Sequence, residues 1–466
     1  MTSPMASTVR RVSVLLIAAS LVATCAARLP STPPDWASPG LIGGGGWPYA
    51  SQAVDPETAA GASYLPRSSV IGLRDGRALL IPFGWDEAIS VPRDDPRVAA
   101  AVRNDSAWLA SGELPGRTVT QRDMASRALL DLRLLTRPNG ASTASWYGEW
   151  NYVWPRDAAF TAAAFDVTGH PTEARRILQF LARTQNQRGL WAARYYTDAT
   201  AVSDGRQVQL DGLGWALWAT WLSHRMDPPG TPQPAELWTM VRRAANRMSR
   251  SLRADGLPPR SSDYFERNPR AEQDPRRPTL GVVAPILTGL RAATSLAIDR
   301  GANAEAQRWQ SAARRVAAAV DRKFKPYGYP RSPVRNGSMD AAVTFLAPPF
   351  GPSDVAVDTA VLTAENRLAL PGGGVLPGER WQGDRTQAWT PETAMFALAA
   401  AAGGRTDEAT ARLAWLAAHR TTLGVLPEKV DQHGRPASVA PLGWTAALVL
   451  LTLQALDHPL PIPPAG

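Results

Sequence analysis

Tryptophan and charged side chains gather in a few short segments of this sequence, where they could bind a sugar. Tryptophan is the commonest aromatic residue, with 17 copies against 9 Tyr and 9 Phe. Trp146, Trp150 and Trp154 surround charged residues directly before an expected helix. Indole rings stack on the apolar faces of sugars, and carboxylates and guanidinium groups hydrogen-bond to hydroxyls. Tryptophan also fills the cores of large helical proteins, and we assign Trp309 and Trp415 to that role.

The segments that carry these residues connect helices of regular length. Apolar residues recur at spacings of three and four from residue 120 onward, which predicts amphipathic helices. Other segments, such as 391–402 and 442–456, are apolar nearly all round and are therefore expected to be buried. The predicted helices span 120–135, 157–168, 172–187, 211–226, 234–254, 279–299, 302–324, 338–347, 355–369, 391–403, 405–419 and 441–457.

Twelve helices of alternating amphipathic and apolar character predict an all-α fold, an (α/α)6 barrel of six helical hairpins. A solenoid would show a clear internal repeat, and the sequence has none. We place the barrel at residues 120–460. A smaller N-terminal extension at residues 51–119 precedes it and contains short strands. Residues 68–83 alternate apolar stretches around Asp75-Gly76, which predicts a β-hairpin.

The N-terminal segment predicts export from the cell. Arg10 and Arg11 precede an apolar run and a stretch of small residues, so we interpret residues 1–27 as an export signal. Residues 28–50 are rich in Pro, Ser and Gly and are expected to form a flexible tether. Cys25 lies at the expected cleavage point. Two interpretations stay open: a lipoprotein signal with lipidation of Cys25, which would anchor the protein to a membrane, or a plain signal peptide.

The composition argues against several other function classes. The formal charge is +9, but the basic residues are dispersed and no nucleic-acid motif accompanies them, so we expect no nucleic-acid partner. Cys25 is the single cysteine and the five His residues are scattered, so we expect neither an internal disulfide nor a metal site. The glycine run at residues 43–46 lacks the Lys and Ser/Thr of a phosphate loop. We therefore expect no cofactor, and a monomer.

Six segments resemble, in the same order, those of glycoside hydrolase family 15, the glucoamylases and their bacterial relatives. The matching segments are WNYVWPRDAAF (150–160), QVQLDGLGW (207–215), DYFE (263–266), MDA (339–341), GVLPEKV (424–430) and PLGWT (441–445). The resemblance spans residues 120–457. One segment departs from the family pattern, because Phe265 stands where the family usually has Trp.

The resemblance implies that Glu266 is the general acid and Glu428 the general base of an inverting glycosidase. Such an enzyme protonates the leaving oxygen with one carboxyl group and activates water with the other, ~6.5–9.5 Å away. Residues so far apart in sequence meet only if a closed architecture brings their loops to one rim. The surroundings of Glu266 are unusually basic, which suits an acid poorly unless burial compensates. Asp263 and Glu272 are the alternative acids.

The resemblance also implies a set of sugar-binding residues. Arg156 and Asp157 are expected to hold the hydroxyls of the terminal sugar, with Glu149 and Asp211 as supporting partners. Arg380 is expected to be a second binding arginine. The complete predicted set is Trp154, Arg156, Asp157, Gln209, Asp211, Arg380, Trp381 and Trp444.

The predicted activity is therefore exo-hydrolysis of a terminal α-linked sugar from an α-glucan or α-glucoside. The alternatives are a trehalase, a hydrolase of another cell-envelope glycan, and a catalytically inactive relative that binds glycan. A phosphorylase of related fold would need a phosphate site in place of the base, and Glu428 argues against it. We expect the protein outside the cell or in the cell envelope, with an oligo- or polysaccharide as its partner.

Overall fold

The computed structural model describes residues 41–42, 61–82, 87–265 and 277–465. The predicted export signal, the lipidation candidate Cys25 and most of the tether lie outside this part of the chain. So do the predicted acid Glu266 and its alternative Glu272.

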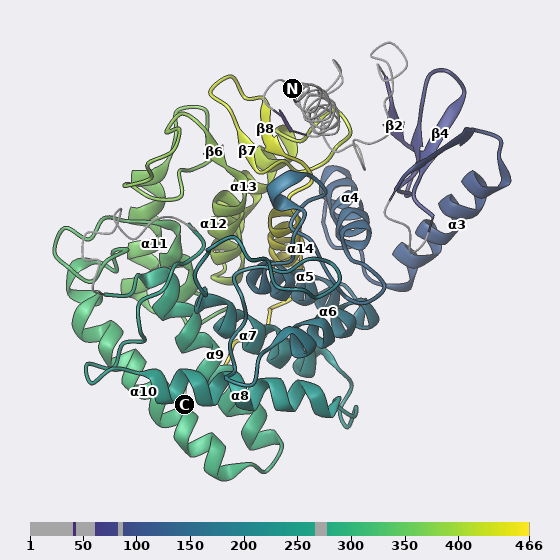
Figure 1. The fold of residues 1–466 in the computed structure, drawn as a ribbon. Helices are drawn as coiled ribbons and strands as arrows, with labels where there is room; N and C mark the ends of the chain where they lie inside the picture. Colours follow the sequence, from purple (N-terminus) through teal and green to yellow (C-terminus); the bar gives the residue numbers. More distant parts are fainter. Residues whose placement is uncertain (1–40, 43–60, 83–86, 266–276, 466) are drawn as a thin grey trace, which may run out of the picture.

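The described residues form an (α/α)6 barrel, as predicted (Figure 1). Each inner element contacts the next, and the last contacts the first, so the inner ring is closed. The inner elements are α5 (Pro155–Val167), α7 (Asp211–Met226), α9 (Leu280–Asp299), the 3₁₀ helix η4 (Ala341–Leu346), α12 (Thr390–Ala402) and α14 (Gly443–Asp457). The outer helices are α4 (Val119–Leu135), α6 (Pro171–Thr184), α8 (Ala235–Ser251), α10 (Asn303–Lys323), α11 (Val355–Leu368) and α13 (Thr406–Ala418).

The two rings differ because their helices bury different shares of their surface. Every residue of α5 is buried, whereas α6 buries only one stripe that includes Ile177 and Leu181. Helix α9 is long and apolar enough to cross a membrane, but 89% of its most apolar window is buried inside the barrel. Glycine brings α7 and α9 close together: a Cβ on Gly214 would lie 2.0 Å from the carbonyl oxygen of Pro285. A larger residue at this crossing would push the two helices apart.

One predicted helix has a different form. Residues 338–347 were expected to be α-helical, but the structure has only the short 3₁₀ helix η4 there. The Asp340 side chain caps its start by accepting a hydrogen bond from the Ala342 amide. Pro348 and Pro349 follow directly and have no amide hydrogen to donate, so the helix cannot continue.

Two small sheets accompany the barrel, and only part of the first was predicted. Strands β3 (Ile71–Gly72) and β4 (Arg77–Leu80) form the predicted hairpin. Strands β2 (Ser63–Tyr64) and β5 (Ile89–Pro92) extend it, and α3 (Pro96–Ser111) follows; these elements were not predicted. The second sheet has the order β1 (Leu41–Ile42), β8 (Pro436–Val439), β7 (Lys429–Val430) and β6 (Ala388–Trp389). This second sheet was also not predicted.

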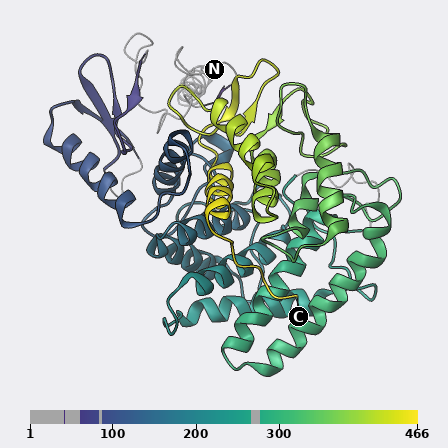
Figure 2. The same ribbon diagram turned by 180° about the vertical axis from the view of Figure 1, so that it is seen from behind.

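The N-terminal sheet and α3 lie beside the barrel in both views (Figures 1 and 2). Figure 2 also shows α14 running from the β6–β8 end of the barrel toward the opposite end, where the C-terminus lies. Ile71 and Leu79 of the N-terminal sheet pack against Leu423 and Val425. These two residues lie five and three positions before Glu428, so the sheet supports the loop that carries the predicted base.

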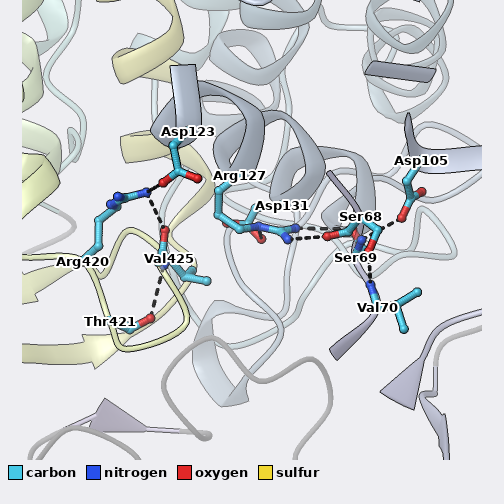
Figure 3. A network of polar contacts seen from close by, with 11 residues as sticks. Ser68, Ser69, Val70, Asp105, Asp123, Arg127, Asp131, Arg420, Thr421 and Val425 are labelled. Carbon is cyan, nitrogen blue, oxygen red and sulfur yellow. Dashed lines mark hydrogen bonds and ion pairs between the residues drawn. The ribbon is translucent and has the colours of Figure 1, made fainter. Parts of the chain in front are cut away.

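A buried arginine strengthens this junction (Figure 3). Arg127 of α4 forms an ion pair with Asp131 at 2.9 Å and donates to the Ser68 carbonyl oxygen at 2.9 Å. Its guanidinium also lies 3.8 Å from the centre of the Tyr64 ring. Burial raises the pKa of Asp131 to about 6, although Arg127 acts in the opposite direction.

Candidate active site

The first turns of the inner helices meet at one end of the barrel. Arg156 at the start of α5 forms an ion pair of 3.2 Å with Asp211, the first residue of α7. Its guanidinium also lies 4.8 Å from the ring centre of Trp444, near the start of α14. The hydroxyls of Thr390 in α12 and Thr445 in α14 are 2.8 Å apart. Residues that begin different helices are thus brought to one place by closure of the ring.

Carboxyl groups accumulate at this end because helix N-termini favour negative charge. Asp157, Asp211 and Glu392 lie in the first turns of α5, α7 and α12. Asp340 caps η4. Glu428 lies in the loop before α14, at the start of β7.

Arg156 is the centre of the predicted sugar-binding cluster. Besides Asp211, it forms an ion pair of 3.2 Å with Asp157 and donates to Gln209 Oε1 at 3.1 Å. All four side chains are buried. Burial raises the pKa of Asp211 to about 6, while the Arg156 charge works against this increase. Five predicted residues therefore meet here, counting Trp444.

Glu428 is held by three neighbours. The indole Nε1 of Trp150 donates to Glu428 Oε1 at 3.0 Å. The Ser438 hydroxyl donates to Oε2, and Lys429 Nζ lies 3.6 Å from the same oxygen. The carboxyl group is nearly buried, with 7% of the residue exposed. Both of its oxygens are therefore fixed in orientation, as a group that aligns a water molecule requires.

Ser438 was not predicted as a site residue. It has a positive φ of 67°, a backbone conformation that is uncommon for residues other than glycine and that concentrates at functional sites. The backbone beside it pairs with the base loop, since the Glu428 amide donates to the Val439 carbonyl oxygen at 2.8 Å. This pairing places the serine hydroxyl against the glutamate. The sequence carries no local signal for it.

Asp263, an alternative acid, is fully engaged in other interactions. One oxygen lies 2.8 Å from Arg331 Nη2 and accepts from the Thr279 hydroxyl at 2.6 Å. The other accepts from the Phe265 amide at 3.0 Å. Arg331, which the sequence analysis missed, also pairs with Asp340 at 2.7 Å. These contacts argue for a structural role of Asp263.

The remaining predicted residues lie at different depths. Trp154 and Trp381 are buried, and Trp381 packs edge-on against Phe265 with ring centres 5.3 Å apart. Arg380 is exposed and donates to the Ser338 hydroxyl at 2.9 Å. None of its described contacts joins it to the Arg156 cluster. Glu149, which was expected to support the sugar-binding residues, forms an ion pair of 3.0 Å with Arg194.

Glu392 is a further carboxyl that the sequence analysis did not select. It is 2% exposed, and its Oε2 has no hydrogen-bond partner among the described residues. Burial raises its pKa to about 8, and the nearby Glu428 charge adds to this increase. The structure thus places a second glutamate beside the predicted base.

Sequence comparison connects the chain to one relative over a limited region. No protein-family profile matches the sequence. An uncharacterized glycosyl hydrolase of Methanocaldococcus jannaschii is 29% identical over 126 residues, which are 26% of this chain. The match covers about a fifth of that relative's length.

Several solved structures share the fold. A variant glycosidase in complex with glucose has a TM-score of 0.62 and 19% identity, over 73% of this chain and 99% of its own. A bacterial glucoamylase in complex with acarbose has a TM-score of 0.60 and 15% identity, over 81% of this chain and 64% of its own. The glucoamylase of Saccharomycopsis fibuligera has a TM-score of 0.59 and 13% identity, over 74% of this chain and 97% of its own. The chain therefore has the (α/α)6-barrel fold of glucoamylases, as its sequence motifs predicted.

Proposed function

We propose that the protein is an inverting glycoside hydrolase that removes a terminal α-linked sugar, with Glu428 as general base. The observation that carries this proposal is the fixed Glu428 carboxyl beside the buried Arg156 cluster. A general base must hold a water molecule in line with the anomeric carbon, so its orientation must be set before the substrate arrives. Trp150, Ser438 and Lys429 meet this requirement.

The Arg156 cluster supports recognition of the terminal sugar unit. A guanidinium group between two carboxylates and an amide offers both donors and acceptors at defined angles, which suits a row of ring hydroxyls. Trp444, whose ring centre lies 4.8 Å from the Arg156 guanidinium, adds an aromatic ring of the kind that packs against sugars. Sugar ligands bound to a glycosidase and a glucoamylase of the same fold point to glucose as the first sugar to test.

The general acid in this proposal is Glu266, which follows Phe265 directly. The contacts of Asp263 favour this assignment, because Arg331, the Thr279 hydroxyl and the Phe265 amide engage both of its carboxyl oxygens. Glu266→Gln and Asp263→Asn separate the two candidates. Loss of activity in Glu266→Gln that a substrate with an activated leaving group restores would identify the acid, since such a group departs without protonation.

Purified protein screened against α-linked disaccharides and cell-wall glycans tests the proposed function. Release of a single sugar from the end of the chain supports exo-hydrolysis of the substrate concerned. Preferential cleavage of trehalose would favour the trehalase alternative. Binding of glycan without hydrolysis across the whole panel would contradict the enzymatic proposal and favour the inactive, glycan-binding alternative.

We further propose that residues 1–27 direct export of the protein. Fractionation of expressing cells tests this proposal, because protein that is retained in the cytoplasm would contradict it. Comparison of the wild type with Cys25→Ser distinguishes the two interpretations of Cys25. Loss of membrane association only in the variant would indicate lipid anchoring through Cys25.

A further inference from the structure

Glu392 lies beside Glu428 because two backbone segments are paired. Strand β6 pairs with β7 so that Trp389 faces Lys429. The Thr390 amide then donates to the Glu428 carbonyl oxygen at 3.0 Å. Two residues later, Glu392 occupies the first turn of α12, on the inner ring of the barrel. The backbone position of Glu392 therefore follows from the same strand pairing that positions the proposed base.

The groups around Glu392 determine its charge. The pKa of Glu392 is raised to about 8: burial is the largest cause and the Glu428 charge a smaller one, while a hydrogen bond with its own backbone acts in the opposite direction. Lys429 and Arg156 lower it, but less than burial raises it. Burial raises the pKa of Tyr264, and the charges of Asp340 and Glu392 add to this increase, so Tyr264 belongs to the same group of interacting residues. At neutral pH Glu392 therefore keeps its proton, and it can donate one hydrogen bond and accept another.

Other residues at this end of the barrel also carry buried polar atoms without partners. The ring centres of Tyr264 and Trp444 lie 6.0 Å apart, and Trp389 lies three residues before Glu392. These residues come from different parts of the ring: Tyr264 before α9, Trp389 before α12 and Trp444 in α14, together with Glu392 itself. The buried Tyr264 Oη, Trp389 Nε1, Trp444 Nε1 and Glu392 Oε2 have no hydrogen-bond partner within the described part of the chain. Buried polar groups almost always find partners in a functioning protein. A polyhydroxylated ligand supplies them, since each hydroxyl both donates and accepts.

We propose that Glu392 binds a hydroxyl group of the terminal sugar as a neutral carboxylic acid. This proposal rests on the proposed function and adds a specificity-determining residue to that site. A neutral carboxyl can bind a hydroxyl beside the negatively charged Glu428, whereas a second carboxylate there would repel the base. Its role is distinct from that of Glu428, because it holds the substrate and does not activate water.

A purely structural role for Glu392 is the alternative, since a carboxyl in the first turn stabilises a helix. A helix-stabilising role favours the charged form of the Glu392 carboxyl, whereas burial favours its neutral form. The two roles also differ in what a substitution does. A structural role affects unfolding and leaves sugar affinity and its pH dependence unchanged.

Binding of D-glucose, measured by calorimetry, and hydrolysis of maltose test the proposal. Glu392→Gln keeps a neutral donor and acceptor and should weaken glucose binding less than tenfold. Glu392→Leu removes both and should weaken it roughly 10- to 100-fold. Wild-type affinity should fall as the pH rises above about 8, as Glu392 ionises, and Glu392→Gln should lack this decline.

Asp166→Asn provides a matched control. Asp166 is also a buried carboxyl whose pKa burial raises, but it lies near the other end of α5. Its substitution should leave glucose affinity and its pH dependence unchanged. Thermal unfolding of each variant confirms that the barrel is intact.

Binding of monodeoxyglucoses identifies the hydroxyl. For one of them the affinities of the wild type and Glu392→Leu should converge, because the bonding partner is missing from the ligand. The proposal would be overturned if the ratio of wild-type affinity to Glu392→Leu affinity were the same for every monodeoxyglucose. A Glu392→Gln variant that binds glucose as weakly as Glu392→Leu would also overturn it, because a charged carboxylate would then be required. If the wild type neither binds glucose nor hydrolyses maltose, the result contradicts the proposed activity on glucosides. The proposal for Glu392 is then also wrong, because there is no glucose hydroxyl for it to bind.

Discussion

Trp150 Nε1 donates a hydrogen bond of 3.0 Å to Glu428 Oε1, across a separation of 278 residues in the chain. Trp150 precedes the first inner helix and Glu428 precedes the last. The bond therefore spans the point where the ring of helices closes. Any change that opens this junction also releases the proposed base from its orientation.

Glu428→Gln should lower kcat by about 10²–10⁴-fold or more while the fold and glucose binding persist. The amide is nearly the same size and can still accept from Trp150, but it cannot take a proton from water. Steady-state kinetics and circular dichroism check this outcome. Glu408→Gln on the outer helix α13 is the control and should retain full activity. A Glu428→Gln enzyme with most of its activity would contradict the assignment of the base.

Trp150→Phe should reduce kcat roughly 10- to 100-fold, because it removes a hydrogen bond to a charged carboxylate and keeps an aromatic ring. Trp415→Phe is a matched control, since its Nε1 donates to the Gly372 carbonyl oxygen on the outside of the barrel. The kcat values of the two variants are measured and compared on the same substrate. Equal activities would mean that the bond to Glu428 does not orient it for catalysis.

The first sugar released from an α-linked substrate should be the β-anomer. Direct attack of water on the face opposite the leaving group inverts the anomeric carbon. A retaining enzyme would hold the sugar covalently on a carboxylate and release the α-anomer, with its two carboxyl groups ~5–5.5 Å apart. Proton NMR in the first minutes of hydrolysis distinguishes the products before mutarotation. Early appearance of the α-anomer would overturn the base role of Glu428.

Arg127→Met should destabilise the protein by about 3–5 kcal/mol, because it leaves the buried Asp131 carboxyl without its partner. Replacing both residues, as Arg127→Met with Asp131→Leu, should recover part of this loss. Denaturant unfolding measures the difference. The exposed Arg103→Met on α3 should stay within about 0.5 kcal/mol of the wild type. A double variant less stable than Arg127→Met would show that the pair itself stabilises the junction.

The contribution of Asp211 and Glu392 to stability should decrease as the pH rises from about 4.5 to about 8. The folded-state pKa values of Asp211 and Glu392 are raised to about 6 and about 8, so the folded protein holds these protons more tightly than the unfolded chain. Their contribution is complete below the unfolded-state pKa values and is lost as the pH passes through the folded ones. The free energy of unfolding of Glu392→Gln, taken relative to the wild type, should therefore be a few kcal/mol higher at pH 9 than at pH 4. Each unit of difference between the folded-state and unfolded-state pKa is worth about 1.4 kcal/mol. Urea unfolding of both proteins at both pH values measures this change. A stability difference between variant and wild type that is the same at pH 4 and pH 9 would contradict the prediction.

The helical pattern of the sequence was sufficient to predict the barrel. Apolar spacing depends only on residues close together in the chain, so it identified the buried helix α12 and the amphipathic helix α6 within a few residues of their ends. The same pattern failed at η4, where two prolines stop a segment of helical character. It also missed β2 and β6, since two-residue strands are too short to show alternation.

Motif resemblance likewise predicted Arg156, Asp157, Gln209, Asp211 and Trp444, which the structure brings together. These residues stand at the starts of helices, where a local segment is distinctive. The tertiary structure alone placed Ser438 and Trp150 on Glu428, engaged Asp263 with Arg331, and set Glu392 near the proposed base. Such partnerships depend on ring closure and strand pairing between distant segments. Burial, which decides whether a carboxyl such as Glu392 is charged, exists only once the ring has closed.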